Sequence, residues 1–367
     1  MRRVLPVVAC AALAITACGG GGDESASCKD AVSGSRVEFT YSVDPAKPGE
    51  SADARRTAAV VCERVRVVKA EGVQVRALST RRVRVVARDD ERSLATADFV
   101  ARPVAFQFYD WEPNVLGERG PDRPFTGPRA LYEATVLASK SKPKAEATDL
   151  PSDRGNDTSG TKYYVFNAER RPLRSDGKPL PPGALPRLAE RPAAPSRSAV
   201  PAGGTVVRVP RGVVVVQAER APNQPATVQR FFVLEDDSEL SGSDIKDAEQ
   251  SVDPRTNQPV ISMKFSEAGR KAFARVTKRA ADRGSRTALP PGAPSRQAFQ
   301  RFAITVDGEI LSLPTIDFVA NPEGIDGRTG AQIQGLGGVE ETRLLAAVLD
   351  VGALPAELTL VSLGRRG

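Results

Sequence analysis

The sequence predicts an α+β fold: a ferredoxin-like base with the element order β-α-β-β-α-β, into which an α+β head subdomain is inserted. Three observations predict it. Residues 35–112 alternate, in that order, between period-two runs typical of strands and runs with helical spacing. Residues 113–204 interrupt this pattern with proline-rich sequence, and regular elements resume over 205–352. Residues 353–367 form a last predicted strand after the final helix.

The elements of the base follow from apolar periodicity. The first strand is predicted from apolar residues at every second position: Val37, Phe39, Tyr41 and Val43. A helix over 51–70 follows, with its apolar residues on one face. Strands over 73–78 and 82–87, a second helix over 90–100 and a strand over 104–111 complete the six elements.

The insert at 113–204 has a different composition. It is rich in Pro, Arg, Ser, Gly and Ala, and such sequence buries too little apolar surface to offset the entropy lost on ordering. We therefore predict a long mobile insert, with a short helix near 128–139 and a strand at 162–167.

The head begins with a series of predicted strands, over 205–209, 213–218, 229–234 and 259–265. A helix follows Ser266, because serine is a favoured N-cap residue and apolar residues then recur at helical spacing.

The last part of the head is predicted to be a hairpin, a glycine-rich loop and a helix. Residues 299–311 alternate around Asp307-Gly308, a dipeptide typical of tight turns. The helix begins near two glutamates, whose charge suits the N-terminal end of the helix dipole. Gly352 is placed to end this helix, and Pro355 prevents its continuation.

The first residues have the pattern of a lipoprotein signal peptide. Arg2 and Arg3 supply positive charge, and the apolar run that follows is too short to span a bilayer. The run ends at Cys18, followed by glycines. We predict a signal peptide over 1–17, lipidation of Cys18 and a flexible tether over 18–34. The alternative is an ordinary signal peptide with a chance cysteine.

Two of the four cysteines remain once Cys10 is removed and Cys18 is lipidated. Export to an oxidising compartment permits a disulfide between Cys28 and Cys62. The alternative is two free thiols, with Cys62 a small core residue.

The composition argues against an enzyme and against a nucleic-acid partner. The chain contains no histidine, which excludes Ser-His-Asp triads and histidine-containing metal sites. The glycine-rich loop at 330–338 lacks the Gly-Lys-Ser/Thr ending of a phosphate loop. The formal net charge is +7, but the arginines are scattered and no aromatic residues alternate with them. We expect a binding protein with no cofactor and no metal.

Short motifs in 299–361 resemble the SecD family, the accessory membrane subunit of the bacterial protein-export channel. They match the extracytoplasmic first periplasmic domain (P1), which has base and head subdomains. The matching residues include Asp307, Gly308, Pro314, Gly330, Gly335, Gly352 and Pro355. An earlier segment, 240–248, carries Gly242, Asp244 and Ile245 in the pattern that opens the SecD head. The resemblance extends over nearly the whole mature chain, and it implies that the last strand, over 353–367, returns to the base.

The resemblance implies an accessory role in Sec-dependent protein export. Its implied partners are the Sec translocon membrane subunits and unfolded preproteins, with the chain lipid-anchored on the outer face of the bacterial cytoplasmic membrane. SecD continues into transmembrane helices that carry a proton-linked acidic residue, whereas this sequence stops at Gly367, so we expect no proton-coupled pulling. The alternative is a stand-alone envelope adaptor that kept the fold.

The resemblance also implies a peptide-binding surface on the head and a hinge. The candidate peptide-binding residues are Phe231, Phe232, Met263, Phe265 and Phe273. The alternative is that these side chains are core residues, and alternation within strands favours that alternative. The candidate hinges are the crossings near Trp111 and Phe299.

Overall fold

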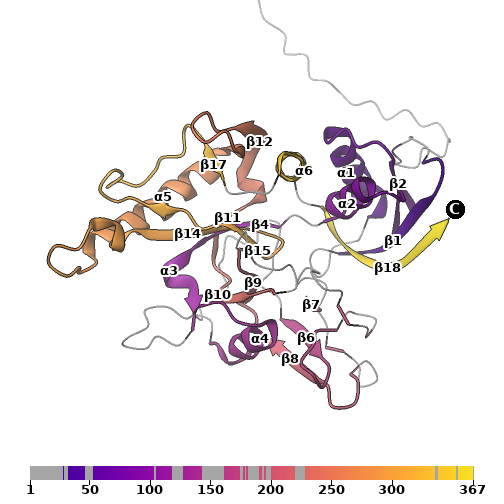
Figure 1. Cartoon of the computed structure of the whole chain (residues 1–367), viewed down its shortest axis with the longest axis horizontal. Helices are drawn as coiled ribbons and strands as arrows, with labels where there is room; N and C mark the ends of the chain where they lie inside the picture. Colours follow the sequence, from indigo (N-terminus) through magenta and orange to yellow (C-terminus); the bar gives the residue numbers. More distant parts are fainter. Residues whose placement is uncertain are drawn as a thin grey trace, which may run out of the picture.

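The fold is α+β, with four sheets and six α-helices in the part of the chain that the structure describes (Figure 1). This computed structural model describes residues 28, 32–45, 53–102, 105–117, 127–142, 161–173, 177, 179–180, 190–191, 194–195, 200–219, 228–334, 338–352 and 354–366. Cys18, the predicted signal peptide and Gly335 lie outside the described residues. Among the described residues, no helix is both long enough and apolar enough to cross a membrane.

The base is a four-stranded antiparallel sheet in the order β18-β1-β3-β2, which packs against two helices. Its elements are β1 (Arg36–Pro45), α1 (Ala54–Val67), β2 (Val73–Ser79), β3 (Arg82–Arg88), α2 (Glu91–Val100) and β18 (Ala356–Arg366). The first five agree with the predicted order, because their apolar periodicity is strong. Asp53 and Asp90 cap the two helices: Asp53 accepts from the Arg55 N–H at 2.9 Å, and Asp90 from the Ser93 N–H at 2.9 Å.

The sixth predicted strand is present as β4, but its predicted place in the base sheet is wrong. β4 (Phe106–Asp110) lies in a different sheet, between β11 and β14, and β18 pairs with β1 in its place. All five residues of β4 are buried, which requires cover on both faces. β18 matches the whole of β1, from Arg36 opposite Arg366 to Pro45 opposite Ala356, whereas β4 is half as long as β1.

A second sheet of eight strands forms the middle of the molecule. Its main path is β11-β4-β14-β15-β9-β10-β5, and β16 pairs with β14. The strands are β4, β5 (Val115–Leu116), β9 (Val213–Gln217), β10 (Phe231–Glu235), β11 (Ser238–Ser241), β14 (Gln300–Val306), β15 (Glu309–Ser312) and β16 (Thr315–Ile316). The short helix α3 (Trp111–Asn114) follows β4. The predicted turn joins β14 to β15, with φ of +51° at Asp307 and +75° at Gly308.

The predicted boundary between insert and head at residue 205 is wrong. A third sheet joins β7 (Glu190–Arg191), β6 (Lys162–Phe166) and β8 (Thr205–Val209), so strands from both sides of residue 205 pair. Helix α4 (Leu131–Lys140) shares a core with β6, β8, β9 and β10. The predicted helix and strand of the insert are thus present, and each packs an apolar face against this core. The stretches of the insert that we expected to be mobile fall mainly outside the described residues.

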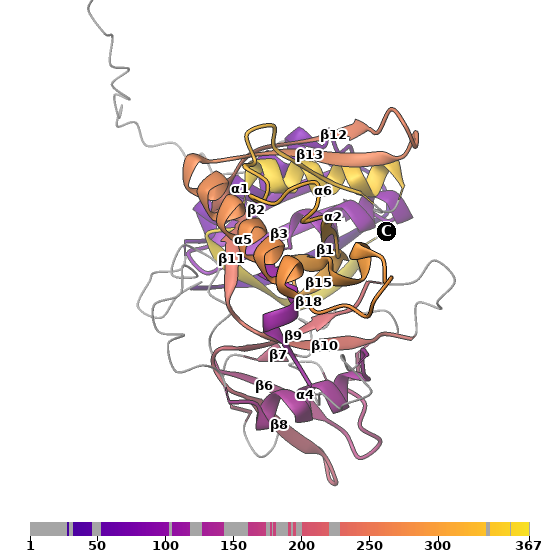
Figure 2. The ribbon, with the colours of Figure 1, turned by 90° about the vertical axis from the view of Figure 1, so that its left-hand side faces the viewer.

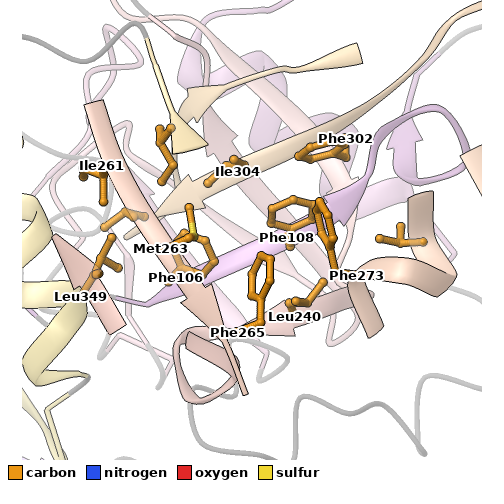
Figure 3. Packing of buried hydrophobic residues seen from close by; sticks show 14 of the residues in the cluster. Phe106, Phe108, Leu240, Ile261, Met263, Phe265, Phe273, Phe302, Ile304 and Leu349 are labelled. Atoms are coloured by element: carbon orange, nitrogen blue, oxygen red, sulfur yellow. The ribbon is translucent and has the colours of Figure 1, made fainter. Parts of the chain in front are cut away.

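The remaining elements of the head enclose the largest core (Figure 3). They are β12 (Ile245–Val252), β13 (Pro259–Phe265), β17 (Ala331–Ile333), α5 (Glu267–Arg286) and α6 (Val339–Val351). Ser266 caps α5 by accepting from the Gly269 N–H at 3.1 Å. At the centre of the core the rings of Phe108 and Phe302 stack with centroids 4.3 Å apart. This core joins β4 and β14 of the middle sheet to the head.

Candidate functional site

The five candidate peptide-binding residues do not form a surface. Four are core residues with at most 9 % of their surface exposed: Phe231, Met263, Phe265 and Phe273. Phe232 is half-buried and packs edge to face on Trp111, with centroids 5.0 Å apart. The residues are also divided among three clusters. The prediction that these residues form a peptide-binding surface is therefore corrected. Their apolar periodicity reflects packing against other side chains inside the molecule, which stabilises the fold.

Two residues of the predicted motifs, Asp244 and Gly330, have a clear structural function in the head. Asp244 accepts from the Ser241 N–H with its carboxylate at 3.0 Å, and from the Ser266 N–H with its carbonyl at 2.8 Å. It thereby fixes the start of α5 against β12, beside Ile245 and Gly242. Gly330 has φ of +81°, and a Cβ there would overlap the carbonyl oxygen of Met263, so only glycine fits.

The motifs around Asp307 and Gly352 meet at the junction between base and head, which we take as the candidate functional site. The chain leaves the base between α2 and β4 and returns between α6 and β18. Helix α6 lies between the two parts (Figure 1). Leu345 and Leu349 face the head core, and Ala347 contacts the base core. The crossings near Trp111 and Phe299, predicted as hinges, are not between base and head. Trp111 is buried in the middle sheet, and Phe299 packs on Phe318.

Arg64 of α1 is the centre of this junction and is fully buried. Its Nη1 donates to the carbonyl oxygens of Val100, at 3.0 Å, and Arg102, at 2.5 Å. Its Nη2 donates to the carbonyl oxygen of Gly352 at 2.5 Å. One guanidinium therefore binds the C-terminal ends of α2 and α6, where helix carbonyls lack partners and carry partial negative charge.

Burial and the charge of a neighbouring carboxylate shift the pKa of Arg64 in opposite directions. Burial lowers the pKa of Arg64 more than the carboxylate of Asp307 raises it, and the net result is a pKa of about 10. At neutral pH the guanidinium remains charged, which keeps all three carbonyl bonds charge-assisted. A guanidinium suits this position better than a lysine ammonium, because its donors are fixed in a planar fork.

Further polar contacts attach the head to the base. Asp307 and Ala105 exchange two hydrogen bonds of 3.0 Å, which fix the β14–β15 turn against the chain that leaves the base. Arg343 of α6 donates to the carbonyl of Val68 at 2.6 Å. Glu340, at the start of α6, is bound by Arg343 and by Arg92 of α2, and these arginines lower its pKa. These contacts hold the head against the base at both places where the chain passes from one to the other.

The sequence reasoning missed Arg64 and Arg343. The signal for Arg64 was its position within the apolar stripe of α1, three residues after Val61 and four before Val68. An arginine there is either a solvated edge residue or a buried ligand of carbonyls, and periodicity alone does not separate the two.

The junction offers no catalytic constellation. Within the described ranges, no group of three or more Cys, Asp or Glu side chains could hold a metal ion. Cys28 and Cys62 are joined in a disulfide, with Cα atoms 5.5 Å apart, which links the described N-terminal end to α1. The arrangement binds helix ends and strands together, and it supplies no nucleophile with a base.

Residues 216–356 match the family model described as SecDF, P1 head subdomain. This segment contains β10 to β17, α5, α6 and the junction residues Asp307 and Gly352.

Curated relatives agree with the match. The chain is 33 % identical over 131 residues to the protein translocase subunit SecD of Acidaminococcus fermentans, which covers 36 % of this chain and 26 % of the relative. It is 30 % identical over 131 residues to SecD of Calditerrivibrio nitroreducens, covering 35 % and 21 %. The matched part is thus about a quarter of the length of these relatives.

A solved structure described as a membrane component SecDF that enhances protein export covers 89 % of this chain and 98 % of its own. The sequence identity is 15 % and the TM-score is 0.42. The family match and the curated relatives together support a SecD P1 domain in this chain.

Proposed function

We propose that this chain is a SecD-like accessory protein of Sec-dependent protein export, which binds translocated preprotein or the Sec channel on the outer face of the membrane. The observation that carries the proposal is the match of residues 216–356 to the SecDF P1 head subdomain. The curated relatives are protein translocase subunits, which makes export the process to test.

The proposed location is the bacterial cell envelope, with a lipid anchor at Cys18. The apolar run that ends at this cysteine supports the anchor. The disulfide between Cys28 and Cys62 supports an oxidising compartment, because such bonds are rare where glutathione and thioredoxin keep thiols reduced.

The binding surface of the head has to consist of exposed side chains, since the aromatic candidates are buried. Three exposed valines lie on the head: Val252 at the end of β12, Val319 after β16 and Val339 at the start of α6. Their exposed fractions are 51 %, 63 % and 58 %. The hairpin of β12 and β13 lies at the end of the molecule furthest from α4 and β8 (Figure 2). An extended, unfolded chain gains affinity from such apolar contacts without a preformed pocket.

Site-specific photo-crosslinking in living cells tests this proposal. A photoreactive residue replaces Val252 or Val319, and Val67 on α1 of the base, 41 % exposed, is the matched control. We expect adducts at the two head positions with many secreted proteins or with Sec membrane subunits, and none at Val67.

The identity of the adducts separates the candidate functions. Secreted proteins indicate a preprotein holder, and Sec subunits indicate docking on the channel. Adducts with one other envelope protein would instead support the stand-alone adaptor. Equal labelling from all three positions would contradict a binding surface on the head.

A further inference from the structure

The outer face of the base sheet, on the side away from α1 and α2, is rich in arginine. Strand periodicity and register place six arginines on this arginine face: Arg36, Arg76, Arg82, Arg84, Arg88 and Arg366. Among the side chains that the structure describes on this face, two carboxylates accompany them. Glu38 lies among the arginines, and Asp44 lies at the far end of β1, where it accepts from Ser42 and Thr359.

The sheet brings like charges together. Arg36 stands directly opposite Arg366, and Arg76 stands directly opposite Arg84. Like charges in such pairs destabilise a sheet. Glu38 offsets part of this repulsion: its carboxylate lies 3.6 Å from Arg36, 3.5 Å from Arg84 and 3.2 Å from Arg366. One carboxylate cannot neutralise three arginines, so the face retains an excess of positive charge.

A cavity of about 210 Å³ opens among these side chains. Arg36, Arg76 and Arg84 line it, together with Glu38, Gln74 and two valines. The Nε of Arg84 is buried and has no hydrogen-bond partner in the described part of the chain. An unsatisfied buried donor on one of three neighbouring guanidinium groups suits an anionic oxygen, such as that of a phosphate diester.

The N-terminal segment leads to this face. The Cys28 N–H donates to the Val75 carbonyl of β2 at 3.1 Å, and Val32 then lines the cavity. Nine residues lie between Cys18 and Cys28, so ten Cα–Cα steps join them. A chain of that length spans at most about 35 Å. An anchor at Cys18 would therefore hold the base within about 35 Å of the membrane surface.

We propose that the arginine face binds the phosphate headgroups of an anionic membrane surface and so orients the base on the bilayer. This inference rests on the proposed lipid anchor. The described start of the chain lies beside the face, and its charge is complementary to anionic lipid. Each arginine held at such a surface contributes roughly fivefold in partitioning.

Vesicle binding of the full chain tests the proposal. Binding is measured with phosphatidylcholine vesicles that do or do not contain phosphatidylglycerol, and the ratio of the two partition coefficients cancels any contribution from the anchor. The test variant carries R76Q, R82Q and R366Q, which leave Arg36 and Arg84 to pair with Glu38. The control variant carries R55Q, R56Q and R66Q, three exposed arginines of α1, and so has the same net charge.

We expect a high ratio for the natural chain and the control, and a ratio about a hundredfold lower for the test variant. Thermal unfolding of the test variant should occur at no lower temperature, because like-charge pairs are relieved. Equal losses in both variants would overturn the proposal, since net charge alone would then explain binding. Displacement by soluble glycerol phosphate at matched ionic strength would also overturn it and indicate a small-anion site. The assay contains no export component, so its outcome is independent of the crosslinking result.

Discussion

Replacing Arg64 with methionine is expected to lower the free energy of unfolding by about 3–5 kcal/mol. Methionine fills a similar volume but leaves the carbonyls of Val100, Arg102 and Gly352 without their donor. Because those carbonyls lie at the C-terminal ends of α2 and α6, the substitution weakens the attachment between base and head. Urea unfolding, followed by far-UV circular dichroism and by the fluorescence of the single tryptophan, measures it.

The two signals report on different parts of the molecule. Trp111 is buried in the middle sheet, whereas circular dichroism includes the helices of the base. In the Arg64 variant we expect the two unfolding transitions to have different urea midpoints, because the base no longer unfolds together with the rest of the molecule. The matched control is R66M on the same helix, whose exposed side chain should change stability by less than about 0.5 kcal/mol. An Arg64 variant as stable as this control would contradict the role given to the junction.

Replacing Phe273 with alanine is expected to cost about 3–5 kcal/mol of stability. Its side chain is 3 % exposed. It contacts three other rings in the head core, with centroid distances of 4.9 Å to Phe265, 5.7 Å to Phe108 and 6.1 Å to Phe302. Truncation leaves a cavity that this dense cluster cannot close. Denaturant unfolding measures the loss.

Two further variants make this test specific. F273L keeps most of the volume and should cost less than about 1.5 kcal/mol. V319A removes an exposed side chain of the same part of the molecule and should change stability by less than about 0.5 kcal/mol. If F273A kept full stability but lost contacts with secreted proteins, Phe273 would belong to a binding surface, and its place in the core would be wrong.

Much of the fold could be predicted because its signals are local. The first five elements of the base, helix α5 and the hairpin around Asp307 each carry their periodicity, caps or turn residues within a short stretch. The partners of a strand are not local. Period-two alternation in residues 106–110 shows a buried strand, but it does not tell whether that strand pairs with β1 or with β14. β18, more than three hundred residues after the start of β1, pairs with it over ten residues.

The candidate site was predictable only in part for the same reason. Resemblance identified Gly330, Asp307 and Gly352, whose backbone roles leave a sequence signature. It could not identify Arg64, because its partners are the ends of two helices that are distant in the sequence. The aromatic residues proposed to bind peptide show the opposite error, because a binding role was predicted for side chains that pack inside the fold. A bulky apolar side chain on a helix or strand is more often a core residue than part of a binding surface.

The maturation rate of exported precursors tests the central claim most directly. Pulse-chase labelling in cells depleted of this chain follows the conversion of Sec-dependent precursors to mature proteins, with a twin-arginine substrate as control. The account predicts slower maturation of Sec-dependent proteins alone, restored by re-expression of the chain. Unchanged maturation in depleted cells would contradict a role in protein export.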